Sequence, residues 1–262
     1  MNSEQQYIDL YTQCREALCQ HSAAPLNALR DEAFAHFKRQ GFPTRKVERY
    51  KYTDMAELFE PNYGLNINRL NIPVNPYEAF RCDVPNLSTS LYFMVNDAFY
   101  HQALPKAQLP EGVVIDSLCS FANTHPDVVS QYYGKLADSA TDSITALNTM
   151  LAQDGLVVYV PRNVKVDRAI QVINILRADV ELMVNRRVLI IMQPNSEAKF
   201  LFCDHAADDR RFLTTQVIEA FVADNASLDL YCLEETHYKN TRVSNVYIEE
   251  QANARVNHNV IT

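Results

Sequence analysis

Two short segments of the sequence concentrate the side chains that bind metals or transfer protons. The first reads Cys-Asp-His-Ala-Ala-Asp-Asp-Arg-Arg over residues 203–211, and the second reads Cys-Leu-Glu-Glu-Thr-His over residues 232–237. Thiol, imidazole and carboxylate groups are suitable ligands for iron or zinc. The candidate residues of the two segments are Cys203, Asp204, His205, Asp208, Asp209, Arg210, Arg211, Cys232, Glu234, Glu235 and His237.

A repeated strand pattern positions both segments. Four asparagines, Asn163, Asn195, Asn225 and Asn253, follow one another at intervals of 32, 30 and 28 residues. The residues seven, five and three positions before each asparagine, and three positions after it, are apolar in fifteen of sixteen cases. Alternate strand residues share one face, and asparagine tolerates the left-handed conformation of a tight turn. Because units of about 30 residues must stack to bury such a face, we predict a parallel β-helix over residues 154–262.

The positions between the ladder residues are also largely apolar, as Val157, Leu189 and Phe221 illustrate. Either another element covers the outer face of the β-helix, or the strands belong to an ordinary buried parallel sheet. The segments between the strands lack long helical periodicity, which favours the β-helix over a doubly wound sheet.

Counting positions from each asparagine argues against a metal site formed by the two segments. Cys203 lies eight residues after its asparagine and Cys232 lies seven after its own, so the two thiols should face opposite sides. We predict that Cys232 packs on the inward ladder and that the charges of both segments are solvated in loops. His258 falls on the inward ladder, where we expect a partly buried, hydrogen-bonded imidazole; a relay or ligand role is the alternative. We therefore assign no catalytic, cofactor-binding or metal-binding residue.

Composition narrows the function classes. The 262-residue chain has a net charge of −8, which argues against nucleic acid or an anionic membrane surface as a partner. It contains no apolar run of 18 residues and no secretory signal pattern, and its six cysteines form no CxxC motif. These features indicate a cytoplasmic protein with reduced thiols. Glycine-rich phosphate loops, GxSxG and HExxH are also absent from the sequence.

The first 153 residues predict smaller elements, which we group as an N-terminal helical region (1–60) and a mixed connecting region (61–153). The segment 41–55 is dense in basic and aromatic residues; it is either a solvated loop with Tyr50 and Tyr52 packed inward or a basic recognition patch. The expected elements are helices at 3–20, from Pro25 to Gly41, 126–133 and 143–151, a hairpin at 91–100, and short strands at 65–70 and 113–115.

Five local strings resemble one known family. They are Gly-Phe-Pro-Thr-Arg-Lys-Val-Glu-Arg-Tyr-Lys-Tyr-Thr at 41–53, Leu-Pro-Glu-Gly-Val-Val-Ile at 109–115, His-Pro-Asp-Val-Val at 125–129, Leu-Asn-Thr at 147–149 and Asp-Gly-Leu-Val-Val-Tyr-Val-Pro-Arg-Asn-Val-Lys-Val at 154–166. Together they resemble the SufB/SufD family of iron–sulfur cluster assembly proteins, and within it the SufD branch. The chain departs from the family pattern at Tyr50, where tryptophan is usual, and at Arg49, where an acidic residue is usual.

The resemblance implies an N-terminal helical region, a right-handed parallel β-helix and a C-terminal helical domain. It also implies pairing with SufB through the β-helix and binding of the ATPase SufC through the C-terminal domain. The sequence stops inside the expected β-helix, so we expect a fragment that is unstable by itself. The SufC-binding region and the late Cys and His residues of the family have no matching positions here.

Two functions follow as hypotheses. The first is a non-catalytic scaffold subunit of iron–sulfur cluster assembly with SufB and SufC as partners. It would hold no cofactor alone, would share an iron–sulfur cluster transiently with SufB, and would form a homodimer through the β-helix when SufB is absent. The second is a cytoplasmic β-helix enzyme that acts on a polysaccharide through Asp204, Asp208, Asp209 and Arg210. The missing signal peptide and the reduced cysteines favour the first.

Overall fold

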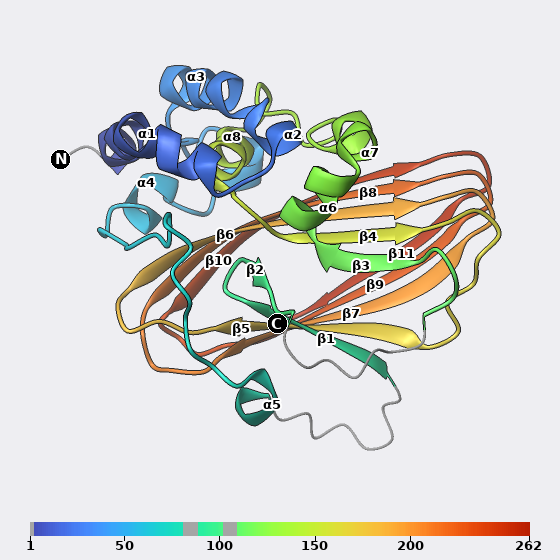
Figure 1. Cartoon of the computed structure of the whole chain (residues 1–262). Helices are drawn as coiled ribbons and strands as arrows, with labels where there is room; N and C mark the ends of the chain where they lie inside the picture. The colour runs from blue at the N-terminus through green and yellow to red at the C-terminus, as the bar shows by residue number, and fades with distance from the viewer. Residues whose placement is uncertain (1–2, 81–88, 102–108) are drawn as a thin grey trace.

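The computed structural model describes residues 3–80, 89–101 and 109–262, and its C-terminal half is a stack of parallel strands (Figure 1). One sheet contains β4 (Leu156–Val160), β6 (Leu182–Met192), β8 (Phe212–Val222) and β10 (Asn240–Glu250). The other contains β5 (Ala169–Leu176), β7 (Glu197–Ala206), β9 (Ser227–Glu235) and β11 (Arg255–Ile261). The chain alternates between the two sheets, so each coil adds one parallel strand to both. The predicted parallel β-helix is confirmed, and we call β4 to β11 the solenoid.

The inward ladder predicted from the four asparagines forms the main core of the solenoid. Strands in successive coils pair in register, for example Val188 with Ile218. All four asparagines have positive φ, from 57° to 62°, as the turn prediction requires. Their side chains also form a ladder along the corner, because each Asn Nδ2 donates to the Oδ1 of the previous one at 2.7, 3.1 and 3.2 Å. The buried ladder residues include Leu156, Val158, Val160, Val166, Val188, Ile190, Met192, Ala198, Ile218, Ala220, Val222 and Leu228.

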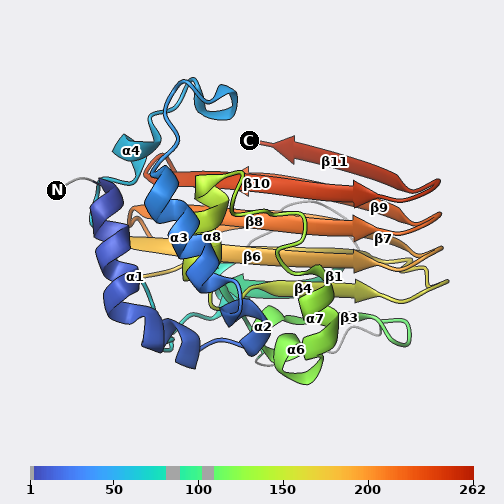
Figure 2. The same ribbon diagram turned by 90° about the horizontal axis from the view of Figure 1, so that it is seen from above.

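Helices cover the outer face of the sheet that contains β4, β6 and β8 (Figure 2). The elements α6 (Leu118–Thr124) and α7 (Pro126–Tyr132) pack on the outward side chains of these strands, including Val157, Leu189 and Phe221. The helix α8 (Ser143–Leu151) lies between the same sheet and the N-terminal helices, and all nine of its residues are buried. A covering layer therefore explains the apolar outward positions, as the first of the two alternatives proposed.

The first strands of the two sheets have antiparallel neighbours. The strand β1 (Thr89–Val95) pairs in parallel with β5 and forms the predicted hairpin with β2 (Ala98–Phe99). The strand β3 (Val114–Ser117) runs antiparallel to β4. Because β2 and β3 do not continue the parallel coil pattern, they close the edge of the stack where the solenoid begins.

The N-terminal helices follow the prediction with one break. The helix α1 (Ser3–Gln20) forms as expected, but the second helix is divided into α2 (Ala24–Asn27) and α3 (Arg30–Gln40), which ends at Gly41 with φ 64°. At the break, Arg30 is fully buried and donates to Asn27 Oδ1 at 2.8 Å and to the Met150 carbonyl oxygen at 2.9 Å. These side-chain contacts attach the break to α8.

The segment 41–55 is a loop with a short 3₁₀ helix, η1 (Glu48–Tyr50), followed by α4 (Met55–Leu58). The prediction is right for Tyr50, which is buried and donates to Asp142 Oδ2 at 2.8 Å. It is wrong for Tyr52, which is 89% exposed because the turn after η1 directs it away from the core. The side chains of Arg45 and Arg49 are exposed, as the solvated-loop reading expects.

The edge strand predicted at 65–70 does not form. Arg69 has φ 52°, and the Asn66 side chain both donates to and accepts from the backbone of Leu70 at 2.8 Å, which closes a turn. A short helix, α5 (Pro76–Ala79), follows. The rest of the expected irregular stretch at 81–88, with Cys82, lies outside the described residues. Among the helices described, none has the length and apolar content needed to span a bilayer.

Candidate functional site

Two adjacent arginines in β6, Arg186 and Arg187, are almost fully buried on opposite faces of the strand. Strand geometry turns Arg186 toward the interior of the solenoid and Arg187 toward the covering helices. Their exposed fractions are 1% and 0%. A buried guanidinium is strongly unfavourable unless carboxylates and other acceptors surround it. Each arginine therefore identifies a charged cluster.

The inner cluster consists of Arg186, Asp204, Glu234 and Arg242. The two oxygens of Asp204 accept one ion-paired hydrogen bond from each arginine, and Glu234 lies 3.1 Å from Arg242. Arg186 Nε also donates to the Asn96 carbonyl oxygen at 2.8 Å, which ties the β1–β2 turn to the interior. Burial lowers the pKa of the Arg186 guanidinium; Asp204 opposes this effect and Arg242 reinforces it.

The outer cluster consists of Tyr133, Arg187 and Glu219. Glu219 is fully buried and accepts from Arg187 Nη2 at 2.7 Å. It also accepts backbone N–H groups of Gly134, Leu136 and Ala137 at 2.9 to 3.0 Å. The Arg187 guanidinium lies 4.6 Å from the centre of the Tyr133 ring. One carboxylate in β8 thus fixes both the arginine and the loop after α7.

The pKa of Arg187 shifts in the opposite direction from that of Arg186. Burial acts to lower the pKa of Arg187, but Tyr133 and the Glu219 carboxylate outweigh it, so the net direction is upward. The outer cluster is therefore an ion-paired contact between sheet and helices. Its chemistry is structural, since the carboxylate is occupied by hydrogen-bond donors on every side.

Sequence reasoning missed the inner cluster, although the repeat contains a signal for it. The positions nine residues before Asn195, Asn225 and Asn253 also face inward, and they are all polar: Arg186, Gln216 and Ser244. On β6 and β8 the inward ladder thus has a polar position, Arg186 and Gln216, between the apolar ladder near the asparagine corner and a second buried apolar group at the start of the strands. Polar positions on an inward ladder predict a buried network, because unpaired polar groups are unfavourable there.

The two segments expected to be solvated loops are mostly strands. Residues 203–206 belong to β7 and residues 232–235 to β9, so Asp204 is 3% exposed and paired rather than solvated. The expected separation of the thiols is confirmed. Cys203 packs on the outer face with Phe93 and Ile173, while Cys232 packs in the solenoid core. Burial raises the pKa of the Cys232 thiol to about 11.

Asp208, Asp209 and His237 lie at the corner between the sheets, whereas His205 lies near the end of β7. His205 contacts the Phe80 ring and lies 3.8 Å from Glu235, while His237 Nε2 lies 3.0 Å from the Asp208 carbonyl oxygen. Among the residues that the structure describes, no three His, Cys, Asp or Glu side chains converge with metal-site geometry. His258 pairs in register with Leu230 as predicted, but it is exposed rather than partly buried.

The carboxylates proposed for polysaccharide chemistry have structural partners. Asp204 is held by two arginines, and Asp208 accepts the backbone N–H groups of Ala178 and Arg210, both at 2.9 Å. Asp209 pairs with Lys239 at 2.5 Å. Glycosidases use two carboxylates on either side of the scissile bond. Here each of the three carboxylates is already engaged by an arginine, a lysine or backbone N–H groups.

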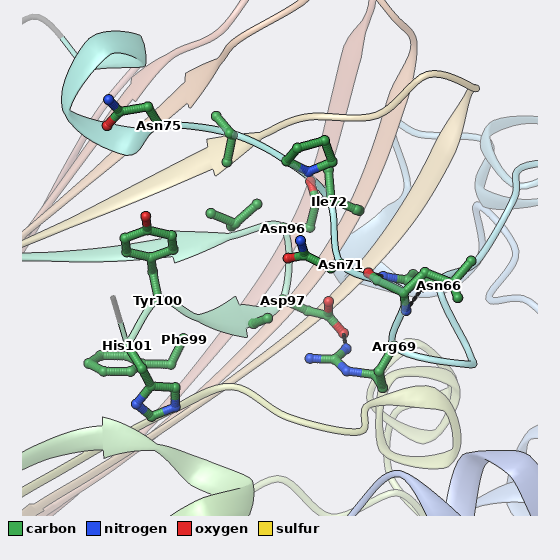
Figure 3. Close-up of a pocket in the computed structure, with 15 residues that line it drawn as sticks. Asn66, Arg69, Asn71, Ile72, Asn75, Asn96, Asp97, Phe99, Tyr100 and His101 are labelled. Atoms are coloured by element: carbon green, nitrogen blue, oxygen red, sulfur yellow. Dashed lines mark hydrogen bonds and ion pairs between the residues drawn. The ribbon is translucent and has the colours of Figure 1, made fainter. Parts of the chain in front are cut away.

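A cavity of about 760 Å³ lies between residues 66–75 and the β1–β2 hairpin (Figure 3). Arg69 reaches into this region but is paired with Asp97 at 2.5 Å and lies 3.6 Å from Asp154. The Asn96 amide both donates to and accepts from the backbone of Arg177. The contacts of Arg69, Asp97 and Asn96 thus join the walls of the cavity to the start of the solenoid.

Comparison with known proteins explains the architecture. A family model described as the SufBD protein N-terminal region matches residues 1–172. A second, described as the SufBD core domain of SUF system FeS cluster assembly, matches residues 174–262. The chain belongs to the SufBD family. The family resemblance stated from the sequence is thereby confirmed, and this SufBD protein contains both family regions in the expected order.

Individual relatives are distant. The chain is 25% identical over 148 residues to the iron–sulfur cluster assembly protein SufD of Bacillus subtilis, which covers 56% of this chain and 34% of that protein. It is 28% identical over 120 residues to the SufBD family protein slr0074 of Synechocystis, covering 45% and 25%. It is 22% identical over 241 residues to the chloroplastic protein ABCI7 of Arabidopsis thaliana, covering 88% and 49%. The matches thus span between a quarter and a half of these relatives.

Proposed function

We propose that this SufBD protein is a non-catalytic scaffold subunit of the cytoplasmic SUF machinery, and that it pairs with SufB and the ATPase SufC. The observation that carries the proposal is the match to both family regions, which together extend over almost the whole chain. The buried charges fit this role, because Arg186 and Arg187 with their carboxylates join sheet to sheet and sheet to helices.

We propose further that an iron–sulfur cluster is cargo of the complex with SufB and not a resident cofactor of this chain. Iron binds the thiolate form of cysteine, so a ligand thiol needs an accessible position and a low pKa. Cys232 lies inside the solenoid with its pKa raised, and Cys203 lies on the opposite face of the sheet. These two positions disfavour a cluster bound between neighbouring coils.

Co-expression tests the partner assignment. The protein is produced with SufB and SufC from the same source, with an affinity tag on SufC. We expect this protein to co-elute with both partners in a constant ratio through size exclusion. If SufB and SufC elute together while this protein elutes separately, the scaffold proposal is wrong. A tag on SufB in a parallel preparation separates direct pairing with SufB from contact through SufC.

A further inference from the structure

Arg186 divides its hydrogen bonds between two parts of the molecule. Its Nε donates to the Asn96 carbonyl oxygen at 2.8 Å, and its Nη1 donates to Asp204 Oδ1. Its Nη2 is buried and has no hydrogen-bond partner among the described residues; one water in the adjacent cavity of about 20 Å³ would satisfy it. Arginine and carboxylate commonly form two parallel hydrogen bonds, so the single contact between Arg186 and Asp204 leaves the stronger, bidentate arrangement unused.

Arg242 prevents the bidentate arrangement. Its Nη1 donates to Asp204 Oδ2, the oxygen that Arg186 Nη2 would need. Arg242 lies in β10, which has β8 as its one neighbour among the described strands, and its side chain is 15% exposed and also lies 3.1 Å from Glu234. By contrast, β6 is buried along its whole length. Arg242 is therefore the more easily displaced of the two arginines, and its displacement would free Asp204 Oδ2 for Arg186.

The other partner of Arg186, Asn96, fixes the turn between β1 and β2. Asn96 has φ 56°, its backbone N–H donates to the Ile175 carbonyl oxygen at 2.8 Å, and its side chain bonds the Arg177 backbone twice. The same turn lines the cavity of about 760 Å³ (Figure 3). Because Asn96 lines this cavity, water there can hydrogen-bond its carbonyl oxygen when Arg186 withdraws.

We propose that Arg186 is a two-position switch that couples β10 to the β1–β2 turn. In the first position, which the structure shows, Arg186 holds Asn96 while Arg242 occupies one oxygen of Asp204. In the second position Arg242 is displaced, and Arg186 pairs with both oxygens of Asp204. The planar guanidinium then turns as a rigid unit and withdraws Nε from Asn96. A displacement in one sheet thereby loosens a turn of the other sheet.

An acidic side chain brought to the edge of β10 is the ligand that fits this switch. A carboxylate competes with Asp204 for the Arg242 guanidinium in the same geometry, and the partial exposure of Arg242 gives it access. Such a ligand binds better when Arg242 has left Asp204, so it favours the second position. The bidentate pair that Arg186 then forms offsets the lost contact between Arg242 and Asp204. This inference does not depend on the proposed partners.

Hydrogen exchange in two variants at one position tests the switch. Arg242→Met removes the guanidinium and retains an extended side chain, whereas Arg242→Lys keeps a charged donor for Asp204. Exchange is followed by NMR at the backbone N–H groups of Asn96 and Tyr100, which hold the β1–β2 region through the Ile175 and Phe93 carbonyl oxygens. We expect both groups to exchange about tenfold faster in Arg242→Met than in the wild type, and at the wild-type rate in Arg242→Lys. Equal rates in all three proteins would overturn the proposal.

A second background separates switching from a general loss of stability. Asp204→Asn offers one oxygen in place of two, so Arg186 gains no bidentate partner when Arg242 is removed. In this background, Arg242→Met should accelerate exchange at Asn96 by less than about twofold. An acceleration of the same size in both backgrounds would show that Arg242 acts through overall stability, and the switch would be wrong. Arg242→Gln, which retains an uncharged donor, replaces Arg242→Met if that protein does not fold, and it should give a smaller acceleration of the same kind.

Discussion

The inner and outer clusters contain adjacent residues of β6, Arg186 and Arg187, yet the two buried arginines have different partners. On the outer face, one arginine has its own carboxylate, an aromatic ring and three backbone N–H groups that share the same carboxylate. On the inner face, two arginines share Asp204. Both clusters leave a buried guanidinium nitrogen without a hydrogen-bond partner among the described residues, Arg186 Nη2 in the inner one and Arg187 Nε in the outer one. The comparison teaches that equally buried arginines can have different structural roles: the outer cluster joins a sheet to the covering helices, and the inner cluster joins the two sheets of the solenoid.

Removal of the outer carboxylate should have the largest effect. Glu219→Ala leaves Arg187 buried without its ion pair and exposes three backbone N–H groups to an apolar environment, so we expect the free energy of unfolding to fall by about 3–5 kcal/mol. Urea denaturation followed by circular dichroism measures the change. Glu250→Ala, at an exposed position in the neighbouring strand β10, is the control and should change stability by less than about 0.5 kcal/mol. Similar effects in the two variants would refute the assigned role of Glu219.

Weakening the Asp204 carboxylate of the inner cluster should lower the free energy of unfolding by less than removal of Glu219. Asp204→Asn keeps one oxygen acceptor for an arginine, and Arg242 retains Glu234 at 3.1 Å, so we expect a loss of about 1.5–3 kcal/mol. Asp229→Asn, which removes a partly exposed partner of Lys199, is the matched control. A cost for Asp204→Asn that exceeds that of Glu219→Ala would reverse the proposed difference between the clusters.

The sequence predicts the apolar half of the solenoid better than its charged half. The ladder before Asn195 and Asn225 follows from a period of two and a turn residue that accepts positive φ, both of which are local properties. The polar inward positions can also be found by counting back from each asparagine, if the count continues to the ninth residue, which is Arg186 for Asn195. Which carboxylate meets which arginine is not local, because Asp204 belongs to the other sheet and its position depends on the length of each corner.

The outer cluster shows the same limit. Glu219 is recognisable as a charged residue at an otherwise apolar outward position. Its hydrogen-bond donors, however, come from the loop that begins at Gly134, more than 80 residues earlier. The division of the second predicted helix before Arg30 has a similar origin, since the arginine is held by the Met150 carbonyl oxygen of α8. Tertiary contacts of this kind override local helix propensity.

The buried thiol of Cys232, in the core of the solenoid, should make the stability of the protein depend on pH. Its pKa is raised by burial to about 11 in the folded protein, above the value of 9 for an ordinary thiol. The folded state therefore favours the neutral thiol, and this contribution to stability is complete below pH 9 and is lost as the pH rises toward 11. We expect stability to fall by about 1–2 kcal/mol more in the wild type than in Cys232→Val over that range. Urea midpoints at pH 8 and pH 10.5 measure the difference, and parallel curves would contradict it.

The smallest expected effect concerns the aromatic member of the outer cluster and separates the ring from its hydroxyl. The Tyr133 hydroxyl is buried and has no hydrogen-bond partner in the described part of the chain, whereas the ring faces the Arg187 guanidinium. Tyr133→Phe keeps the ring and removes an unsatisfied hydroxyl, so its free energy of unfolding should stay within about 0.5 kcal/mol of the wild type or rise. Tyr133→Leu removes the ring and should cost about 1–2 kcal/mol through the lost cation–π contact. If Tyr133→Phe is as destabilising as Tyr133→Leu, the hydroxyl and not the ring supports Arg187, and the outer cluster depends on a polar contact that resembles those of the inner one.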